Sequence, residues 1–201
     1  MEHEDIEIVL RRANADGDIR TSANLAQSVE LAGATFEVQC IKSADLSSKQ
    51  KVTIMDILRD NMRTMYEENG WGWKEVEKRK EVFDKRSRFI LLQDSNQEVV
   101  AYVIFRFEWD DEDEPEYPVL YCYELQVSQS TQKSGTGKVL MSMLMQVAKH
   151  YGMRKTSLTV FKNNAAAMGF YKKIGFVIDS NSPSNFGCPD ECYEILSDKN
   201  F

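Results

Sequence analysis

ELQVSQSTQKSGTGKVL, residues 124–140, is the stretch of this sequence that decides the fold. An alternating, strand-like run leads into the turn Gln132-Lys133-Ser134-Gly135-Thr136-Gly137, and a helix pattern begins directly after it. Glycines at such a junction let backbone N–H groups face outward, and the helix N-terminus adds partial positive charge, so the turn can hold a pyrophosphate. The spacing is neither a Walker A loop, because Val139 follows Lys138, nor GxGxxG. A glycine-rich connection without a ligand is the alternative interpretation.

Strand and helix patterns follow one another on both sides of this turn. The expected strands are 36–42, 88–93, 98–109, 118–127, 155–161, 176–179 and 192–196, and the expected helices are 48–69, 71–83, 135–152 and 163–175. The first 35 residues are Ala-rich and are expected to be helical. We therefore expect an α+β fold with a mixed, mostly antiparallel central sheet flanked by helices. Residues 36–201 form its single domain, and residues 1–35 are a helical extension packed on it.

Composition and charge exclude several classes of protein. The 201 residues suffice for about one domain, and 25 basic against 32 acidic residues give a net charge of −7. This balance argues against nucleic acid as the direct ligand and favours a basic partner. The acidic N-terminus and the short apolar runs predict neither a targeting signal nor a membrane segment. The four scattered cysteines predict free thiols and no metal site, and a chain with two histidines argues against Ser-His-Asp chemistry.

A second motif, NNAAAMGFYKKIGF (163–176), follows the glycine turn after one further strand. The two motifs in this order resemble the GNAT superfamily of acetyl-CoA-dependent N-acetyltransferases. The resemblance implies the GNAT fold, with acetyl-CoA as co-substrate and its pyrophosphate held by Gln132 to Lys138. The pantetheine arm would pair with Leu125, Gln126 and Val127 like an added strand and would meet Asn164. Tyr171 occupies the place of a tyrosine acid in many members, and packing under the coenzyme is an equal alternative.

Four further segments resemble the NatD type of N-terminal acetyltransferase. They are NMRTMYEENGWGWKEVEKRK (61–80), YCYELQV (121–127), LTVFKNN (158–164) and SPSNFGC…CYEIL (182–196). Enzymes of this type acetylate the N-terminal Ser of histones of the 4 and 2A classes, whose tails begin Ser-Gly-Arg-Gly. The resemblance therefore implies these histone tails as partners. It also implies a monomer that acts without an auxiliary subunit in the cytoplasm and nucleus.

The chemistry of amine acetylation points to one carboxylate. An α-amine has a pKa of about 7.7–8.0, so a proton must leave before or during its attack on the thioester. Glu124, on the strand that would flank the acetyl group, is the expected general base, acting through a water; a solvated strand residue is the alternative. Tyr121 and Tyr123 share one strand face, with Cys122 and Glu124 on the other unless a bulge intervenes. The family's bulge here could bring Tyr123 and Glu124 to the same cleft, and Glu124, Tyr123 and Tyr121 are the expected catalytic residues.

Aromatic and acidic residues would bind the peptide. By the resemblance, the first residues of the peptide would be surrounded by Tyr66, Trp71, Tyr121, Tyr123, Thr159 and Tyr193. Tyr66 also continues the apolar stripe of its helix and could be core. Seven of the nine residues in 108–116 are acidic, which is otherwise typical of a solvated loop. Glu108 and Asp110 would clasp the substrate Arg, although the family typically has Asp at the first position and Glu at the second.

Three functions follow, and they are separable by experiment. The first is a histone-directed N-terminal acetyltransferase. The second is a GNAT enzyme for Lys side chains or a small amine, which would tolerate a blocked N-terminus. The third is a non-catalytic acidic binder of histone tails. The aromatic residues expected around the start of the peptide favour a substrate with a small first residue. The glycine turn together with Glu124 argues against a binding protein without catalytic activity.

Overall fold

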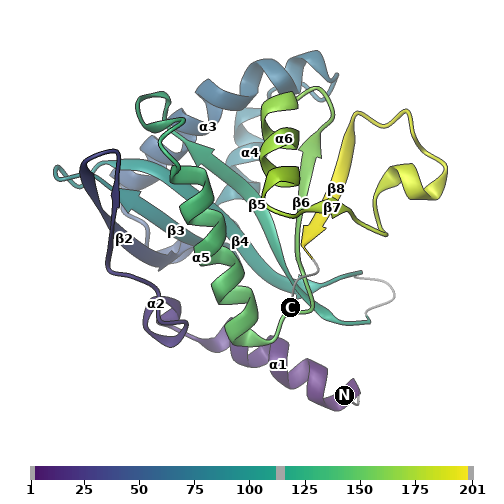
Figure 1. Cartoon of the computed structure of the whole chain (residues 1–201), viewed down its shortest axis with the longest axis horizontal. Coiled ribbons are helices and arrows are strands. Elements are labelled where there is room, and N and C mark those ends of the chain that lie inside the picture. Colours follow the sequence, from purple (N-terminus) through teal and green to yellow (C-terminus); the bar gives the residue numbers. More distant parts are fainter. Residues whose placement is uncertain (1–2, 112–115, 199–201) are drawn as a thin grey trace.

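The computed structural model describes residues 3–111 and 116–198. Within them the chain forms one eight-stranded sheet in the order β1-β2-β3-β4-β5-β6-β8-β7 (Figure 1). The strands are β1 Ser28–Leu31, β2 Ala34–Lys42, β3 Arg88–Gln93, β4 Val99–Trp109, β5 Pro118–Val127, β6 Thr156–Phe161, β7 Val177–Ile178 and β8 Tyr193–Asp198. The helices are α1 His3–Ala15, α2 Ile19–Ser22, α3 Ser48–Glu68, α4 Glu75–Val82, α5 Thr136–Tyr151 and α6 Ala165–Lys173. This confirms the expected α+β architecture.

The sheet carries a separate apolar core on each face. In Figure 1, α5 crosses the near face, and α3 and α4 lie behind the sheet. Residues of α5 and α6 pack with those of the N-terminal helices in one cluster, which includes Leu144 and Tyr171. Residues of α3 and α4 form the second cluster, which includes Leu58 and Val82. Alternate residues of β3 and β4 serve the two clusters, as the two-residue period of a strand requires.

One pair of neighbouring strands is parallel, and its geometry positions the site. β5 and β6 are in register only over Leu120–Cys122 and Thr156–Leu158. Beyond that point β5 continues beside β4 and β6 continues beside β8. The facing edges of β5 and β6 are therefore left without strand partners towards their carboxyl ends, and Figure 1 shows the two strands diverging there.

Local signals explain where the helices around the site begin. At the start of α3 the Ser47 hydroxyl accepts from the Gln50 amide, and the Gln50 side chain accepts from the Ser47 amide, which is a capping box. After α3, Gly70 and Gly72 adopt φ of +76° and +65°. These left-handed conformations reverse the chain, so the expected helix over 71–83 starts only at Glu75.

The N-terminal segment departs from its expected helical structure. α1 and α2 are helical, but Ser28–Leu31 forms β1 and pairs with β2. The Arg88 guanidinium joins α1 to the sheet because it donates to the backbone carbonyls of Ala13, Asn14 and Asp16. In the described part of the chain, no helix is both long and apolar enough to cross a bilayer.

Candidate active site

A cavity of about 230 Å³ lies where β5 and β6 diverge. Ten of the residues expected at the site line it: Tyr66, Trp71, Tyr121, Tyr123, Glu124, Leu125, Gln126, Thr159, Asn164 and Tyr171. Its lining includes Tyr66 of α3, Trp71 just after that helix, and Tyr171 of α6. The ten residues come from five segments: α3, the turn after α3, β5, β6, and α6 with the residue that caps it.

A β-bulge in β5 sets which side chains face this cavity. Ile104 of β4 pairs with Glu124, but the next residue, Phe105, pairs with Cys122, so Tyr123 is an extra residue on β5. Cys122 and Leu125 consequently pack in the cluster that includes α5, and both also border the cavity. Tyr123 and Glu124 both line the cavity. The bulge removes the alternation that would otherwise put these two side chains on opposite faces.

Glu124 is held by two donors deep in the cavity. Its Oε1 lies 2.8 Å from the Nζ of Lys78, and its Oε2 accepts from the Gln126 side chain at 2.9 Å. The side-chain Oε1 of Gln126 in turn accepts from the Asn61 side chain of α3 at 3.0 Å. Glu124 is 8% exposed and Lys78 is 6% exposed. A carboxylate has about four lone-pair sites, so this one retains acceptor capacity for a further ligand.

An aromatic wall closes the α3 side of the cavity. The Tyr66 ring makes edge contacts with Trp71 and Phe161, with ring centroids 5.7 and 5.3 Å apart. Trp71 also contacts Tyr193 of β8 at 5.7 Å, which ties Tyr193 to the wall although it does not line the cavity. Burial and the negative charge of Glu124 raise the pKa of Tyr66 to about 12, so its hydroxyl is protonated near neutral pH.

Two tyrosine hydroxyls of β5 have fixed partners. Tyr121 shares a hydrogen bond of 2.5 Å with Thr159 of β6, which spans the point where the strands separate. Burial raises the pKa of Tyr121 to about 12. Tyr123 donates to Glu108 Oε2 at 2.8 Å, and the Arg106 guanidinium lies over its ring, 3.8 Å from the centroid. Both rings therefore have fixed orientations at the mouth of the cavity.

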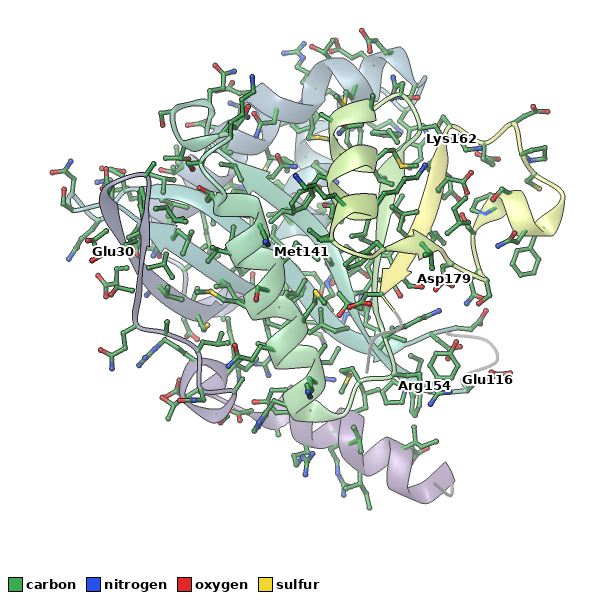
Figure 2. All side chains as sticks on the ribbon, viewed as in Figure 1. Glu30, Glu116, Met141, Arg154, Lys162 and Asp179 are labelled. Atoms are coloured by element: carbon green, nitrogen blue, oxygen red, sulfur yellow. The ribbon has the colours of Figure 1, made fainter. Side chains whose placement is uncertain are left out.

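The two acidic residues expected to bind an arginine differ in their surroundings. Glu108 does not line the cavity but lies next to it through Tyr123, and Arg86 NH1 is 3.4 Å from its Oε1. Asp110 accepts from the Glu116 and Tyr117 amides and so closes the β4–β5 connection. Figure 2 labels Glu116 at this end of the sheet and Lys162 towards the other end. Residues 112–115 of the acidic segment lie outside the described residues.

The glycine turn forms a ready anion site at the start of α5. Lys133 and Gly135 adopt φ of +61° and +89°. In the described chain no side chain caps the α5 N-terminus, so its first amides are available to a ligand. The Ser134 hydroxyl bonds to the Thr131 carbonyl and the Thr136 hydroxyl, which orders the turn. These residues fit a pyrophosphate.

The neighbouring elements fit the rest of the coenzyme. A Cβ on Gly137 would lie 3.6 Å from Phe170 and 3.9 Å from Leu125, at ordinary van der Waals distance, so the start of α5 lies close to both α6 and β5. The Val127 carbonyl accepts from the Asn61 and Gln132 side chains. Leu125 and Gln126 lie beyond the part of β5 that pairs with β6, so the backbone groups on this edge can pair with an extended ligand.

Comparison with known proteins identifies the family. The sequence matches the acetyltransferase (GNAT) family over residues 53–176, which is more than half of the chain. The chain belongs to the GNAT family. It is thus an acetyltransferase that uses acetyl-CoA, and the GNAT fold expected from the sequence is confirmed.

Solved GNAT structures share this fold at low sequence identity. The PaiA N-acetyltransferase of Thermoplasma acidophilum in complex with coenzyme A has a TM-score of 0.57 at 15% identity, covering 81% of this chain and 99% of that one. A chain of the NatC complex bound to Gag peptide and CoA has a TM-score of 0.56 at 12% identity, covering 82% and 99%. An acetyltransferase of Streptococcus agalactiae has a TM-score of 0.58 at 13% identity, covering 81% and 98%. Identities this low support the shared fold alone.

Lys78 and Glu81 also line the cavity of this GNAT enzyme, and the sequence reasoning missed them. Helix α4 is short and highly charged, so it lacks an apolar stripe that would show its inward face. One signal was available, because Lys78 precedes the buried Val82 by four residues and shares its face. In the described residues, no group of three or more His, Cys, Asp or Glu side chains could hold a metal ion.

Proposed function

We propose that this GNAT enzyme transfers acetyl from acetyl-CoA to the N-terminal Ser amine of histone tails of the 4 and 2A classes. The observation that carries the proposal is the small cavity in which Glu124 lies opposite an aromatic wall. Such a cavity favours a chain terminus with a small first residue over a long alkylamine. The sequence similarity to the NatD type over residues 61–80, 121–127 and 158–164 supports the same substrate.

Glu124 is the residue that would take the proton of the amine. Bound acetyl-CoA supplies an activated acetyl thioester. Glu124 first takes a proton from the ammonium through a water, which frees the nitrogen lone pair to form its bond to the acetyl carbon. As the carbon–sulfur bond breaks, the nitrogen loses its second proton and the departing thiolate takes up a proton. The Tyr121 and Tyr123 hydroxyls, fixed by Thr159 and Glu108, orient the incoming terminus. Burial raises the pKa of Tyr171 well above its ordinary value, so it stays protonated, either as the donor to the departing thiolate or as a packing residue.

Charge complementarity would select the third residue of the tail. Glu108 lies beside Tyr123, so a peptide whose amine reaches Glu124 would bring its Arg towards this carboxylate. Arg86, whose side chain is about half exposed, is near the same oxygen and would be displaced by a substrate guanidinium. Asp110 would add negative charge from the end of β4. We propose that the enzyme acts as a monomer, without an auxiliary subunit, in the cytoplasm and nucleus.

The deciding experiment is acetyl transfer from acetyl-CoA to a Ser-Gly-Arg-Gly-Lys peptide and to its N-terminally blocked twin. Product on the free peptide alone is the expected result. Product on both peptides would move the reaction to the Lys side chain. Binding of both substrates without turnover would instead favour a non-catalytic acidic binder.

A further inference from the structure

Lys78 is a lysine whose ammonium is enclosed by three elements of the fold. Its Nζ lies 2.8 Å from Glu124 Oε1 on β5 and donates to the Tyr66 hydroxyl on α3 at 2.6 Å. Both carboxylate oxygens of Glu81 on α4 are 3.2 Å away. An ammonium has three N–H donors, so these three partners use all of them.

The charge of Glu124 dominates the surroundings of this ammonium. Burial alone lowers the pKa of Lys78, but Glu124, Tyr66 and Glu81 together outweigh the burial and raise the pKa above its ordinary value, with Glu124 the largest of the three. The side chain of Glu81 is 45% exposed, so water screens its charge more than that of Glu124. Lys78 therefore stays positive, and its closest ionic partner is the proposed base.

We propose that Lys78 is a positioning residue for acetyl transfer, which keeps the Glu124 carboxylate ionised and turned towards the cavity. The proposal rests on the proposed function in one respect, that Glu124 takes the proton. A buried carboxylate without a counter-charge takes up a proton at higher pH. A protonated Glu124 could not accept a proton from the amine, so loss of Lys78 would disable the base without touching the substrate.

The other groups around Glu124 cannot replace this charge. The titratable groups that face Glu124 are Lys78 and Glu81 on α4, Tyr66 on α3, Tyr102 on β4, Cys122 on β5 and Tyr171 on α6. Burial raises the pKa values of the three tyrosines and of Cys122, so these groups are neutral near neutral pH. Within the described residues, Lys78 is the only cation of this set.

The test compares the wild type with Lys78→Met and with Lys80→Met, a matched control whose exposed side chain lies two residues further along α4. Protein labelled with ¹³C at its glutamate carboxyl groups is titrated by NMR, and Glu124→Gln identifies the Glu124 signal by its loss. Between about pH 6 and about pH 9 we expect the Glu124 signal of Lys80→Met to follow that of the wild type. In Lys78→Met the same signal should titrate inside this range.

Turnover gives a second readout. In Lys78→Met, the fall of kcat on the acid side of its pH profile should occur about one pH unit or more higher than in the wild type. KM for the amine should change less than about threefold. Lys78→Arg, which keeps the charge, should restore the wild-type profile. If Lys78→Met does not fold, Lys78→Gln takes its place, because the amide keeps hydrogen bonding without the charge.

An unchanged Glu124 titration in the folded variant would overturn the proposal. A uniformly lower kcat without a shift on the acid side of the profile would overturn it as well, since a purely structural lysine affects every pH alike. Failure of the proposed function is distinguishable from both results. In that case the wild type acetylates neither peptide, and the NMR titration still decides the role of Lys78.

Discussion

Two buried lysine–carboxylate pairs, Lys78–Glu124 and Lys155–Asp179, join different elements of the fold. Lys155 contacts both oxygens of Asp179 at 2.8 Å, and Asp179 also accepts from the Asn181 amide. Asp179, labelled in Figure 2, is 0% exposed and lies next to no cavity described for the site. Lys78 and Glu124 are nearly as buried, but both line the cavity where β5 and β6 diverge.

The two pairs differ in which groups the carboxylate oxygens can still accept hydrogen bonds from. The oxygens of Asp179 accept hydrogen bonds from Lys155 and from residues of the loop after β7. Asp179 therefore joins that loop to the sheet. Glu124 divides its oxygens between Lys78 and Gln126 and keeps lone pairs for whatever enters the cavity. A buried ion pair therefore indicates function only when an open space adjoins it.

Glu124→Gln is expected to have the largest effect on catalysis. The amide keeps the shape but cannot accept the proton, so kcat should fall by about 10²–10⁴-fold with little change in peptide binding. Steady-state kinetics and a peptide-binding titration check this. Equal losses of binding and turnover would mark Glu124 as structural and so remove the distinction from Asp179.

Asp179→Asn should show the opposite pattern. The substitution leaves the Lys155 ammonium buried without its counter-charge, which typically costs about 3–5 kcal/mol of unfolding free energy. Urea unfolding measures the loss, and kcat of the folded protein should stay within about twofold. A large fall in kcat at unchanged stability would contradict the structural role of this pair.

Glu108→Gln probes a third pair, Arg86–Glu108, whose arginine is about half exposed. Gln can still accept from Tyr123, so the change removes charge alone. KM for a Ser-Gly-Arg-Gly peptide should rise about tenfold, and KM for its Arg-to-Ala counterpart should hardly change. Arg86→Ala should act in the opposite direction, because it frees Glu108 for the substrate. A similar loss for both peptides would contradict the arginine contact.

The pH dependence of stability should give the smallest effect. Burial alone would raise the pKa of Asp179, but its interactions with Lys155 and the Asn181 amide contribute to a net lowering of the pKa. A lowered folded-state pKa contributes stability above the unfolded value of about 3.9, and that stability is lost as pH falls through the folded-state pKa. Tm should therefore decline more steeply below about pH 4 in the wild type than in Asp179→Asn. Parallel declines would exclude this contribution.

Strands with strong apolar patterns could be predicted from the sequence, and short ones could not. The runs 88–93 and 118–127 coincide with β3 and β5 because their β-branched and aromatic residues leave little choice of conformation. Ser28–Leu31 was missed because its four residues become a strand only through pairing with β2. In the same way, Glu124 could be predicted from the chemistry, whereas Lys78 lies in a charged run that any solvated helix could contain.

The sequence by itself determined the order of elements and the glycine turn before α5, since these depend on local periodicity and spacing. It also carries the membership in the GNAT family, through its match to that family over residues 53–176. The tertiary structure decided which groups meet. The bulge at Tyr123 brings Tyr123 and Glu124 to one face, α4 brings Lys78 to Glu124, and Arg86 comes to lie beside Glu108. Such partners come from segments far apart in the chain. Their pairing depends on strand register and helix packing, which no local pattern encodes.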